Sequence, residues 1–341
     1  MDTPLVSVCV PAFNGAEFLA DCLSSVLRQT EREFEVLVVD DASSDQTVSV
    51  AKEFARRDPR VVVHCFSERA GLVGNWNRSL QLAKGEWIKF VFQDDLLHPN
   101  CLAEQLHCAR VSGLPFVMAR RAFLFEEGTS SDRRAFYTNH LDIPAIFGPS
   151  TRSIPAASVA HAAIGHFGIN FFGEPTSALL HRRVFADVGV FSAALAMICD
   201  LEFWVRVGSR FGCAYVDEEL SQFRVHGRST SDEFLSRRQF RVSIDGLILR
   251  HLYAYAEEFE PLRQAITGQF SAKSLQERFW QDLRRLQFQL IAGKGRPQHE
   301  SMRHEWRNAI EAYGRISRWH VYAARVLSNL EASIRADRVA L

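Results

Sequence analysis

The sequence lacks the features that would place it in several large classes of protein. Its 40 lysines and arginines balance 40 aspartates and glutamates, so there is no basic excess of the kind that nucleic-acid-binding proteins use. No apolar run reaches the roughly 18–20 residues that a membrane span needs. The first residues lack the positive stretch and the apolar core of a signal peptide. We therefore expect a globular protein that meets any lipid-linked substrate at its surface.

Cysteine is present but lacks the spacing of a metal site or a disulfide framework. The seven cysteines are odd in number, scattered, and without a Cys-x-x-Cys pair. Such usage is typical of reduced thiols and predicts a cytoplasmic protein. No internal repeat or low-complexity tract is visible.

Strand and helix patterns alternate over the first hundred residues. Apolar runs predict strands over residues 5–10, 34–39, 61–66 and 87–92. Apolar residues at helical spacing predict helices between them, over residues 16–29, 47–54 and 71–82. This order predicts an α/β fold with a mostly parallel, Rossmann-like sheet flanked by helices.

The alternation weakens after residue 99. We expect a helix over 101–111, a strand over 116–125, a helix over 199–210 and two edge strands over 214–216 and 220–225. Residues 126–158 are rich in Ser, Thr, Pro, Gly and charge, and we interpret them as a long loop region. The expected organisation is an α/β domain over 1–230, with halves 1–98 and 99–230, and a helical C-terminal region over 231–341.

Two pairs of aspartates follow predicted strands. Asp40 and Asp41 come after the strand at 34–39, and Asp94 and Asp95 come after the strand at 87–92. In a parallel sheet these carboxylates emerge at the carboxyl edge, where open α/β sheets bind ligands. Carboxylates that converge in one crevice suit a hard cation and a nucleotide diphosphate.

Five ordered segments carry a resemblance to a known family. They are VSVCVPAFN (6–14), VVDDASSD (38–45), AKGEWI (83–88), QDD (93–95) and DLEFWVR (200–206). Over about residues 5–230 the chain resembles the family 2 inverting glycosyltransferases of the GT-A fold. The resemblance implies a hexosyltransferase-type enzyme that moves a sugar from a UDP- or dTDP-linked donor to a hydroxyl of a glycan, a lipid-linked or a small-molecule acceptor. It also implies Mg²⁺ or Mn²⁺ and a role in cell-surface polysaccharide biosynthesis.

The resemblance assigns the donor site to the ends of the first strands. The predicted donor-binding residues are Pro11, Ala12, Phe13, Asn14, Asp40, Asp41, Asn77 and Asp94. Phe13 would form an aromatic wall for the base, where the family more often has Tyr, or it belongs to the core. Asp41 would accept the N3–H of a pyrimidine while Asp40 fixes the turn or a sugar hydroxyl. Alternatively, both aspartates begin a turn and cap the next helix.

The metal site is assigned to Asp95 and His226, with Asp94 on a ribose or a water. Phe92 stands where the family often has a further carboxylate, so the acidic signature is incomplete. The alternatives are a solvated acidic turn and a structural histidine. A bound cation would bridge the two phosphates of the donor and neutralise the departing diphosphate.

Asp200 is the predicted general base, because inverting transfer needs a carboxylate to take the proton of the attacking hydroxyl. Glu202 is the alternative base, and helix capping is the alternative role for Asp200. Cys199 stands where the family often has Glu. Glu174 and Thr176 are predicted to bind the acceptor, or they simply form a turn before a strand.

The sequence also bears on two alternative functions and on one possible interaction surface. A sugar nucleotidyltransferase needs a Gly-rich, basic first loop, and residues 11–18 contain one Gly and no Lys or Arg. A catalytically degenerate scaffold is suggested by Phe92 and Cys199. Residues 315–327 are basic and amphipathic, a pattern that suits peripheral contact with the inner face of a membrane, a partner helix, or packing on the catalytic domain.

Overall fold

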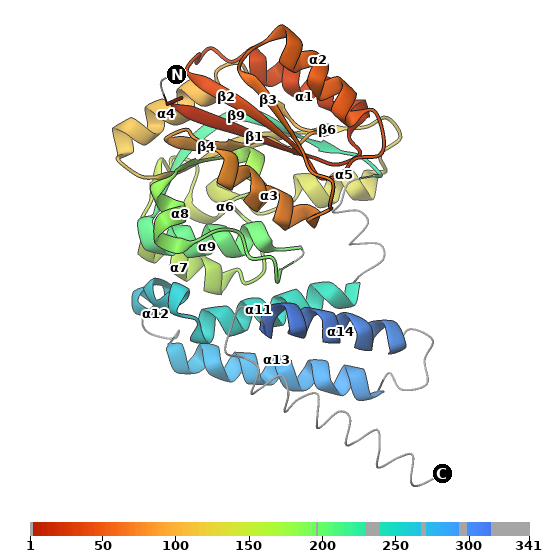
Figure 1. Ribbon diagram of the computed structural model, residues 1–341. Coiled ribbons are helices and arrows are strands. Elements are labelled where there is room, and N and C mark those ends of the chain that lie inside the picture. Colours follow the sequence, from red (N-terminus) through yellow and green to blue (C-terminus); the bar gives the residue numbers. More distant parts are fainter. Residues whose placement is uncertain (1–2, 196, 229–238, 267–270, 293–298, 315–341) are drawn as a thin grey trace.

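The computed structural model describes residues 3–195, 197–228, 239–266, 271–292 and 299–314 (Figure 1). A twisted sheet with helices on both faces forms one part of this described chain, and helices α11 to α14 lie below it (Figure 1). Over the described residues the sheet has nine strands, in the order β3-β2-β1-β4-β8-β6-β9-β5, with β7 paired to β9.

The first half of the sheet is parallel, as the sequence predicts. Its strands are β1 (Val6–Ala12), β2 (Phe34–Asp40), β3 (Val61–Cys65) and β4 (Trp87–Phe90), and its helices are α1 (Ala16–Leu27), α2 (Thr47–Arg57) and α3 (Gly71–Leu82). Alternate residues of β1 face opposite ways: Val8 packs toward α1, whereas Cys9 joins the cluster that contains Trp76 of α3. Both faces of β1 and β2 are therefore buried, which explains their continuous apolar runs, whereas β3 lies at the edge of the sheet and is partly exposed.

The second half of the sheet is mixed. Its elements are β5 (Leu96–Leu97), α4 (Cys101–Ser112), β6 (Phe116–Phe125), α7 (Ala156–Gly165), η1 (Pro175–Ser177), β8 (Ala178–His181), α8 (Arg183–Val188), α9 (Cys199–Phe211) and β9 (Cys213–Val225). β8 runs antiparallel to both β4 and β6, whereas β6 and β9 are parallel. The sheet thus reverses direction where the first half ends.

Two predictions about the second half are wrong. The two expected edge strands are one strand, β9, which lies between β6 and β5. The expected loop region contains α5 (Ser131–Thr138), α6 (Ile143–Phe147), β7 (Ser153–Ile154) and the start of α7. Ser130 and Asp142 accept hydrogen bonds at the starts of α5 and α6, so the polar residues that suggested a loop include helix caps.

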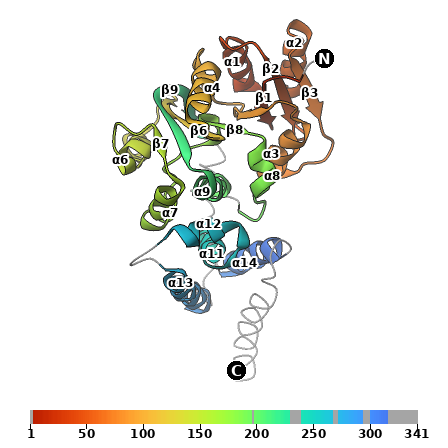
Figure 2. The same ribbon diagram turned by 90° about the vertical axis from the view of Figure 1, so that its left-hand side faces the viewer.

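The C-terminal region is helical where the structure describes it. Its elements are α11 (Gln239–Tyr255), η2 (Glu257–Phe259), α12 (Glu260–Ala265), α13 (Ala272–Ala292) and α14 (His299–Gly314), and Figure 2 shows α11 and α12 between α9 and α13. Ile244, Phe279 and Trp306 join the same apolar cluster as Phe203 of α9. Among the described helices, none is long and apolar enough to cross a membrane.

Polar contacts also join α11 to the segment that precedes α9. Arg241 donates to the carbonyl of Ala194 at 2.7 Å and to Asp245 Oδ1 at 2.8 Å. Asp245 Oδ2 in turn accepts the backbone N–H of Met197 at 3.0 Å. The predicted unit boundary at residue 230 stays a prediction, and the predicted surface helix at 315–327 lies outside the described residues.

Candidate active site

Both carboxylates of the first aspartate pair are buried, but only Asp41 has hydrogen bonds on both of its oxygens. Asp41 Oδ1 accepts from the Ala70 N–H at 2.7 Å and from Arg78 Nη1 at 2.9 Å, and Oδ2 accepts from the Gly71 N–H at 2.8 Å. Asp40 Oδ2 accepts from the Ser43 N–H at 2.9 Å, but its buried Oδ1 has no hydrogen-bond partner. Asp41 therefore holds the start of α3, and Asp40 is the member with a free acceptor.

Phe13 lies beside this pair and outside the apolar clusters of the described chain. The guanidinium carbon of Arg69 lies 3.6 Å from the centre of its ring, a cation–π contact. Pro11 and Ala12 are buried at the end of β1, and Ala12 pairs with Asp40 of β2. Phe13 is half-buried and directly follows Ala12, the strand partner of Asp40; its role at the donor stays a prediction.

Asn14 and Asn77 use their side chains within the protein. Asn14 has a φ of 46°, and its Oδ1 accepts from the Ser44 N–H at 2.8 Å. Asn77 Nδ2 donates to the carbonyl of Phe191 at 2.9 Å, and its Oδ1 accepts from the Phe191 N–H at 3.2 Å. Both polar atoms of Asn77 are occupied, so this geometry speaks against its predicted role at the donor.

The two members of the second aspartate pair differ in burial and in hydrogen bonding. Asp95 is 1% exposed, its Oδ2 accepts from Thr176 Oγ1 at 2.5 Å, and its Oδ1 accepts from the Arg224 N–H at 3.1 Å. Burial raises the pKa of Asp95 well above its usual range, and the charge of Asp94 adds to the rise. Asp94 is half-buried, and its Oδ2 lies 2.9 Å from His226 Nε2.

This arrangement favours a different metal ligand from the one that the sequence suggests. Both oxygens of Asp95 are engaged in the interior, so its carboxylate braces β9 and the loop before β8. Asp94 Oδ2 and His226 Nε2 lie 2.9 Å apart, so a cation that used both atoms would have to displace the proton between them. Across the part of the chain that the structure describes, no group of three or more His, Cys, Asp or Glu side chains could hold a metal. A cation here would need oxygens from a substrate.

Asp200 lies in the first turn of α9 and is half-buried. Its Oδ1 accepts from the Leu201 N–H at 2.7 Å, and its Oδ2 accepts from Asn170 Nδ2 at 2.9 Å. Burial raises the pKa of Asp200 to about 7, and the charge of Glu174 adds to the rise. A carboxylate with this pKa takes up protons near neutrality, which is the property that a general base needs.

Glu202, the alternative base, is occupied elsewhere. It is 2% exposed and forms a bidentate ion pair with Arg206, at 2.6 and 3.0 Å. Arg206 also donates to the carbonyl of Val190 at 2.9 Å. Since a buried and fully paired carboxylate cannot reach a substrate without breaking this pair, the geometry speaks against Glu202 as the base.

A short segment joins the acidic groups. Asn170 binds Asp200, Thr176 binds Asp95, and between them Glu174 forms an ion pair with Arg121 at 2.5 Å. Thr176 is 2% exposed and donates to Asp95, so its predicted contact with an acceptor is not supported by this geometry. Sequence reasoning missed Asn170 and Arg121, because neither belongs to a motif; only the fold brings them to the site.

The sequence analysis also assigned no structural role to Gln93, which holds the backbone of Phe13. Its Oε1 accepts from the Phe13 N–H at 2.9 Å, and its Nε2 donates to the Phe13 carbonyl at 3.1 Å. A Cβ added to Gly15 would lie 2.1 Å from the Gln93 amide, so only glycine leaves room for this clamp. The clamp fixes the loop after β1 against the segment that carries Asp94.

Comparison with known proteins identifies the family of the chain. Residues 7–185 match the model of Glycosyl transferase family 2. The chain is 30% identical over 240 residues to the uncharacterized protein MT1568 of Mycobacterium tuberculosis, which is 69% of this chain and 72% of that protein. It is 29% identical over 130 residues to the putative teichuronic acid biosynthesis glycosyltransferase TuaG of Bacillus subtilis, 38% of this chain and 52% of that protein.

Two solved structures share the fold. S. aureus TarS 1-349 in complex with UDP-GlcNAc superposes with a TM-score of 0.55 at 18% identity, over 91% of either chain. The mannosyltransferase PcManGT from Pyrobaculum calidifontis, in complex with GDP-Man and Mn²⁺, gives a TM-score of 0.54 at 17% identity, over 95% of this chain and 85% of that one. The sheet with its flanking helices is the GT-A fold, and the C-terminal helices follow it. On its sequence and its fold, the chain is a glycosyltransferase that belongs to glycosyl transferase family 2.

Proposed function

We propose that the protein transfers a sugar from a UDP- or dTDP-linked donor to an acceptor hydroxyl with inversion, and that Asp200 is the general base. The observation that carries this proposal is the Asp200 carboxylate, whose pKa burial raises to about 7 and which hydrogen-bonds to Asn170. The segment from Asn170 to Thr176 connects this carboxylate to Asp95 and hence to Asp94. Hydrogen bonds from residues 170–176 thus link the proposed general base, Asp200, to the acidic pair at the sheet edge.

We assign Asp40 to recognition of the nucleobase of the donor. A pyrimidine presents N3–H as a donor, and Asp40 Oδ1 is a buried acceptor with no partner. Asp41, which the sequence suggests for this role, has both oxygens on α3 and on Arg78. Phe13 supplies the neighbouring aromatic face. Solved neighbours that hold UDP-GlcNAc and GDP-Man support a nucleotide-sugar donor.

Asp94 and His226 are our choice for a divalent cation. Mg²⁺ is commonly bound by one or two carboxylates together with substrate phosphates, so a site with few protein ligands fits a cofactor that arrives with the donor. Mn²⁺ in the PcManGT complex supports the same expectation. When bound, the cation would neutralise charge on the leaving diphosphate. Arg224 donates to the Asp94 carbonyl at 2.9 Å and holds the loop that carries this carboxylate.

The chemical step needs one proton acceptor. The acceptor hydroxyl gives its proton to Asp200 as its oxygen attacks the anomeric carbon from the face opposite the diphosphate. The bond between that carbon and the diphosphate oxygen breaks, and its electron pair leaves with the nucleotide. Asn170 keeps the Asp200 carboxylate oriented. We further propose that the acceptor is a glycan or a lipid-linked molecule of cell-surface polysaccharide synthesis. The relative TuaG, whose name refers to teichuronic acid biosynthesis, supports this proposal.

Asp200→Asn tests the proposal. We expect transfer to fall at least 100-fold, because general base catalysis contributes about 10² to 10⁴. Binding of UDP with Mn²⁺, followed by thermal shift, is expected to be unchanged, since Asp200 takes no part in holding the donor. Full transfer activity in this variant would reject Asp200 as the base. A wild-type protein that binds UDP with Mn²⁺ but neither transfers nor hydrolyses any donor would favour the degenerate scaffold instead.

A further inference from the structure

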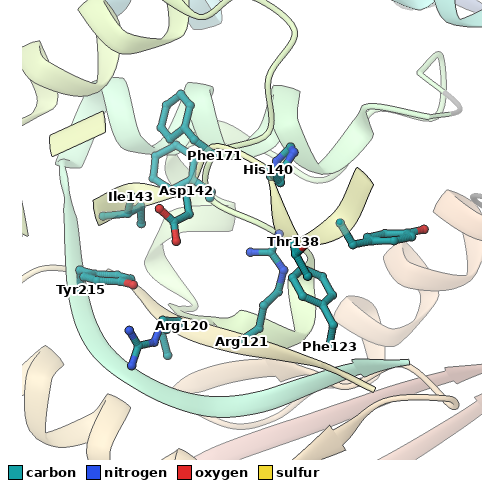
Figure 3. Close-up of a pocket in the computed structure, with 12 residues that line it drawn as sticks. Arg120, Arg121, Phe123, Thr138, His140, Asp142, Ile143, Phe171 and Tyr215 are labelled. Carbon is teal, nitrogen blue, oxygen red and sulfur yellow. The ribbon is translucent and has the colours of Figure 1, made fainter. Parts of the chain in front are cut away.

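A pocket opens where β6 and β9 meet the segment that contains α5 and α6 (Figure 3). The space between its walls is roughly 470 Å³, a figure that includes solvent at its open mouth. Aromatic rings, guanidinium groups and one carboxylate line it together. The residues that matter here are Arg120, Arg121, Phe123, Asp142, Phe171 and Tyr215.

The polar groups enter this pocket from different walls. Figure 3 shows the carboxylate of Asp142 and the guanidinium of Arg121 directed into the cavity, with the ring of Tyr215 at the side. Asp142 Oδ1 accepts from the Ala145 N–H at 3.0 Å, so the carboxylate is fixed at the start of α6. Burial raises the pKa of Tyr215, so its hydroxyl stays protonated and can donate.

In and around the pocket, carboxylates outnumber guanidinium groups. Arg121 Nε lies 2.5 Å from Glu174 Oε2, and Arg120 Nη1 lies 3.3 Å from Asp217 Oδ1. Asp142 adds a further carboxylate to the wall. The two guanidinium groups are therefore matched by carboxylates before any ligand arrives. A phosphate or carboxylate on a ligand would find no surplus positive charge and would lie near Asp142.

The aromatic walls suit a ring with an apolar face. Phe123 and Tyr137 lie with ring centres 5.5 Å apart, and Phe171 and Phe172 with ring centres 4.6 Å apart. Such walls, combined with a few convergent hydrogen-bonding groups, are typical of sites that orient an amphipathic ligand. A pyranose has C–H faces for the rings and hydroxyls for the carboxylate and guanidinium groups.

The pocket is also connected to the proposed base. His140 Nε2 lies 2.7 Å from the carbonyl oxygen of Asn170, whose side chain binds Asp200. Arg121 pairs with Glu174, the residue whose charge helps to raise the pKa of Asp200. A Cβ added to Gly173 would lie 2.4 Å from Arg121 Nη1, so the guanidinium packs directly on this segment. One stretch of chain therefore forms a wall of the pocket and positions the base.

We propose that this pocket binds an uncharged pyranose residue of the acceptor glycan. The inference rests on the proposed function, because it assigns the acceptor side of that same site. Asp142 and Arg121 bind hydroxyls of the sugar, Tyr215 donates a hydrogen bond, and Phe123, which is half-buried, packs on the ring face. Acceptors whose corresponding sugar carries a phosphate or a carboxylate are excluded by the charge balance.

Saturation-transfer NMR on the full chain tests this assignment. The probes are the methyl glycosides of glucose, galactose and mannose, with methyl glucuronide as the anionic counterpart. We expect at least one neutral glycoside to bind at millimolar concentration and the glucuronide to bind at least tenfold more weakly. Asp142→Asn keeps a good helix cap but removes the charge, and Tyr215→Phe removes only the hydroxyl. Each is expected to weaken binding of the neutral glycoside about tenfold. Asp132→Asn on exposed α5 is the matched control and is expected to change nothing.

The possible outcomes separate the two proposals. Absence of binding by every neutral glycoside, tighter binding of the glucuronide, or unchanged binding in both pocket variants would each overturn the pocket assignment. UDP with Mn²⁺ is measured on the same samples by thermal shift. If UDP binds and the glycosides do not, only the pocket assignment fails. If the glycosides bind as expected and UDP with Mn²⁺ does not, the donor side of the proposed function fails while the pocket stands.

Discussion

Asp200 is expected to destabilise the folded protein above neutral pH. Its pKa lies at about 7 in the folded chain against an ordinary value of 3.8, with burial as the main cause. Because the folded state holds the proton more tightly, the stability contribution of this group falls as pH rises from about 4 to about 7 and is constant above that. The difference in pKa corresponds to at most about 4 kcal/mol.

The variant Asp200→Asn isolates this contribution. An uncharged amide escapes the cost of burying a charge, so the variant should gain stability relative to the wild type as pH rises. We expect a gain of about 1–3 kcal/mol between pH 5 and pH 8, less than the full amount. The reduction arises because Asp200 is only half-buried and because an amide cannot accept from both Leu201 and Asn170.

Urea unfolding followed by tryptophan fluorescence at several pH values measures this difference. Asp187→Asn, at an exposed aspartate of α8, is the matched control and should show no trend with pH. A stability difference between Asp200→Asn and the wild type that does not change with pH, or that favours the wild type more at pH 8 than at pH 5, would refute the reasoning. The pH profile of transfer provides a second check, with loss of activity on the acidic side of about pH 7.

Three further substitutions separate structural carboxylates from functional ones. Glu202→Gln leaves the Arg206 guanidinium buried without its ion pair, so unfolding in urea should become easier by about 3–5 kcal/mol. Thr176→Val removes the hydrogen bond to the buried Asp95 and should cost about 1–3 kcal/mol in the same assay, with an equal stability in the variant arguing against that contact. Asp94→Asn should abolish the extra thermal shift that Mn²⁺ gives to UDP, at little cost to the stability of the free protein; an intact Mn²⁺ effect would show that Asp94 is not the ligand.

The sequence is sufficient to predict β1 and β2 because both faces of these strands are buried. Their apolar runs are continuous and end at turn residues, which sets their limits closely. β9 was divided in the prediction because Asp217, Glu218 and Glu219 interrupt its apolar pattern. Arg120 of β6 lies beside these acids and pairs with Asp217, so the sheet accommodates the charge across the strand pair. A local sequence pattern carries no information about an ion-pair partner on a distant strand.

The sequence predicts where the acidic pairs lie in the fold, but it does not predict which carboxylate of each pair is held by the protein. Neighbouring residues at a strand end point to different sides, so each aspartate pair offers two distinct positions. Which member of a pair has both oxygens hydrogen-bonded depends on groups far along the chain. The start of α3 binds Asp41, and Thr176 binds Asp95. The sequence analysis preferred the anchored member of each pair, since no pattern within the motif reveals a contact 29 or 81 residues away.

The contacts of Arg241 and Asp245 with residues 194–197 affect how the enzyme can be shortened. A fragment that stops at residue 230 would lose the hydrogen bonds that hold the chain just before Asp200. It would also remove Leu249 and Leu262, which share an apolar cluster with Leu201 and Val205 of α9 in the intact chain. We therefore expect α11 and α12 to be needed for stable folding, and we expect expression trials that stop at residue 230 to yield aggregates rather than a minimal enzyme.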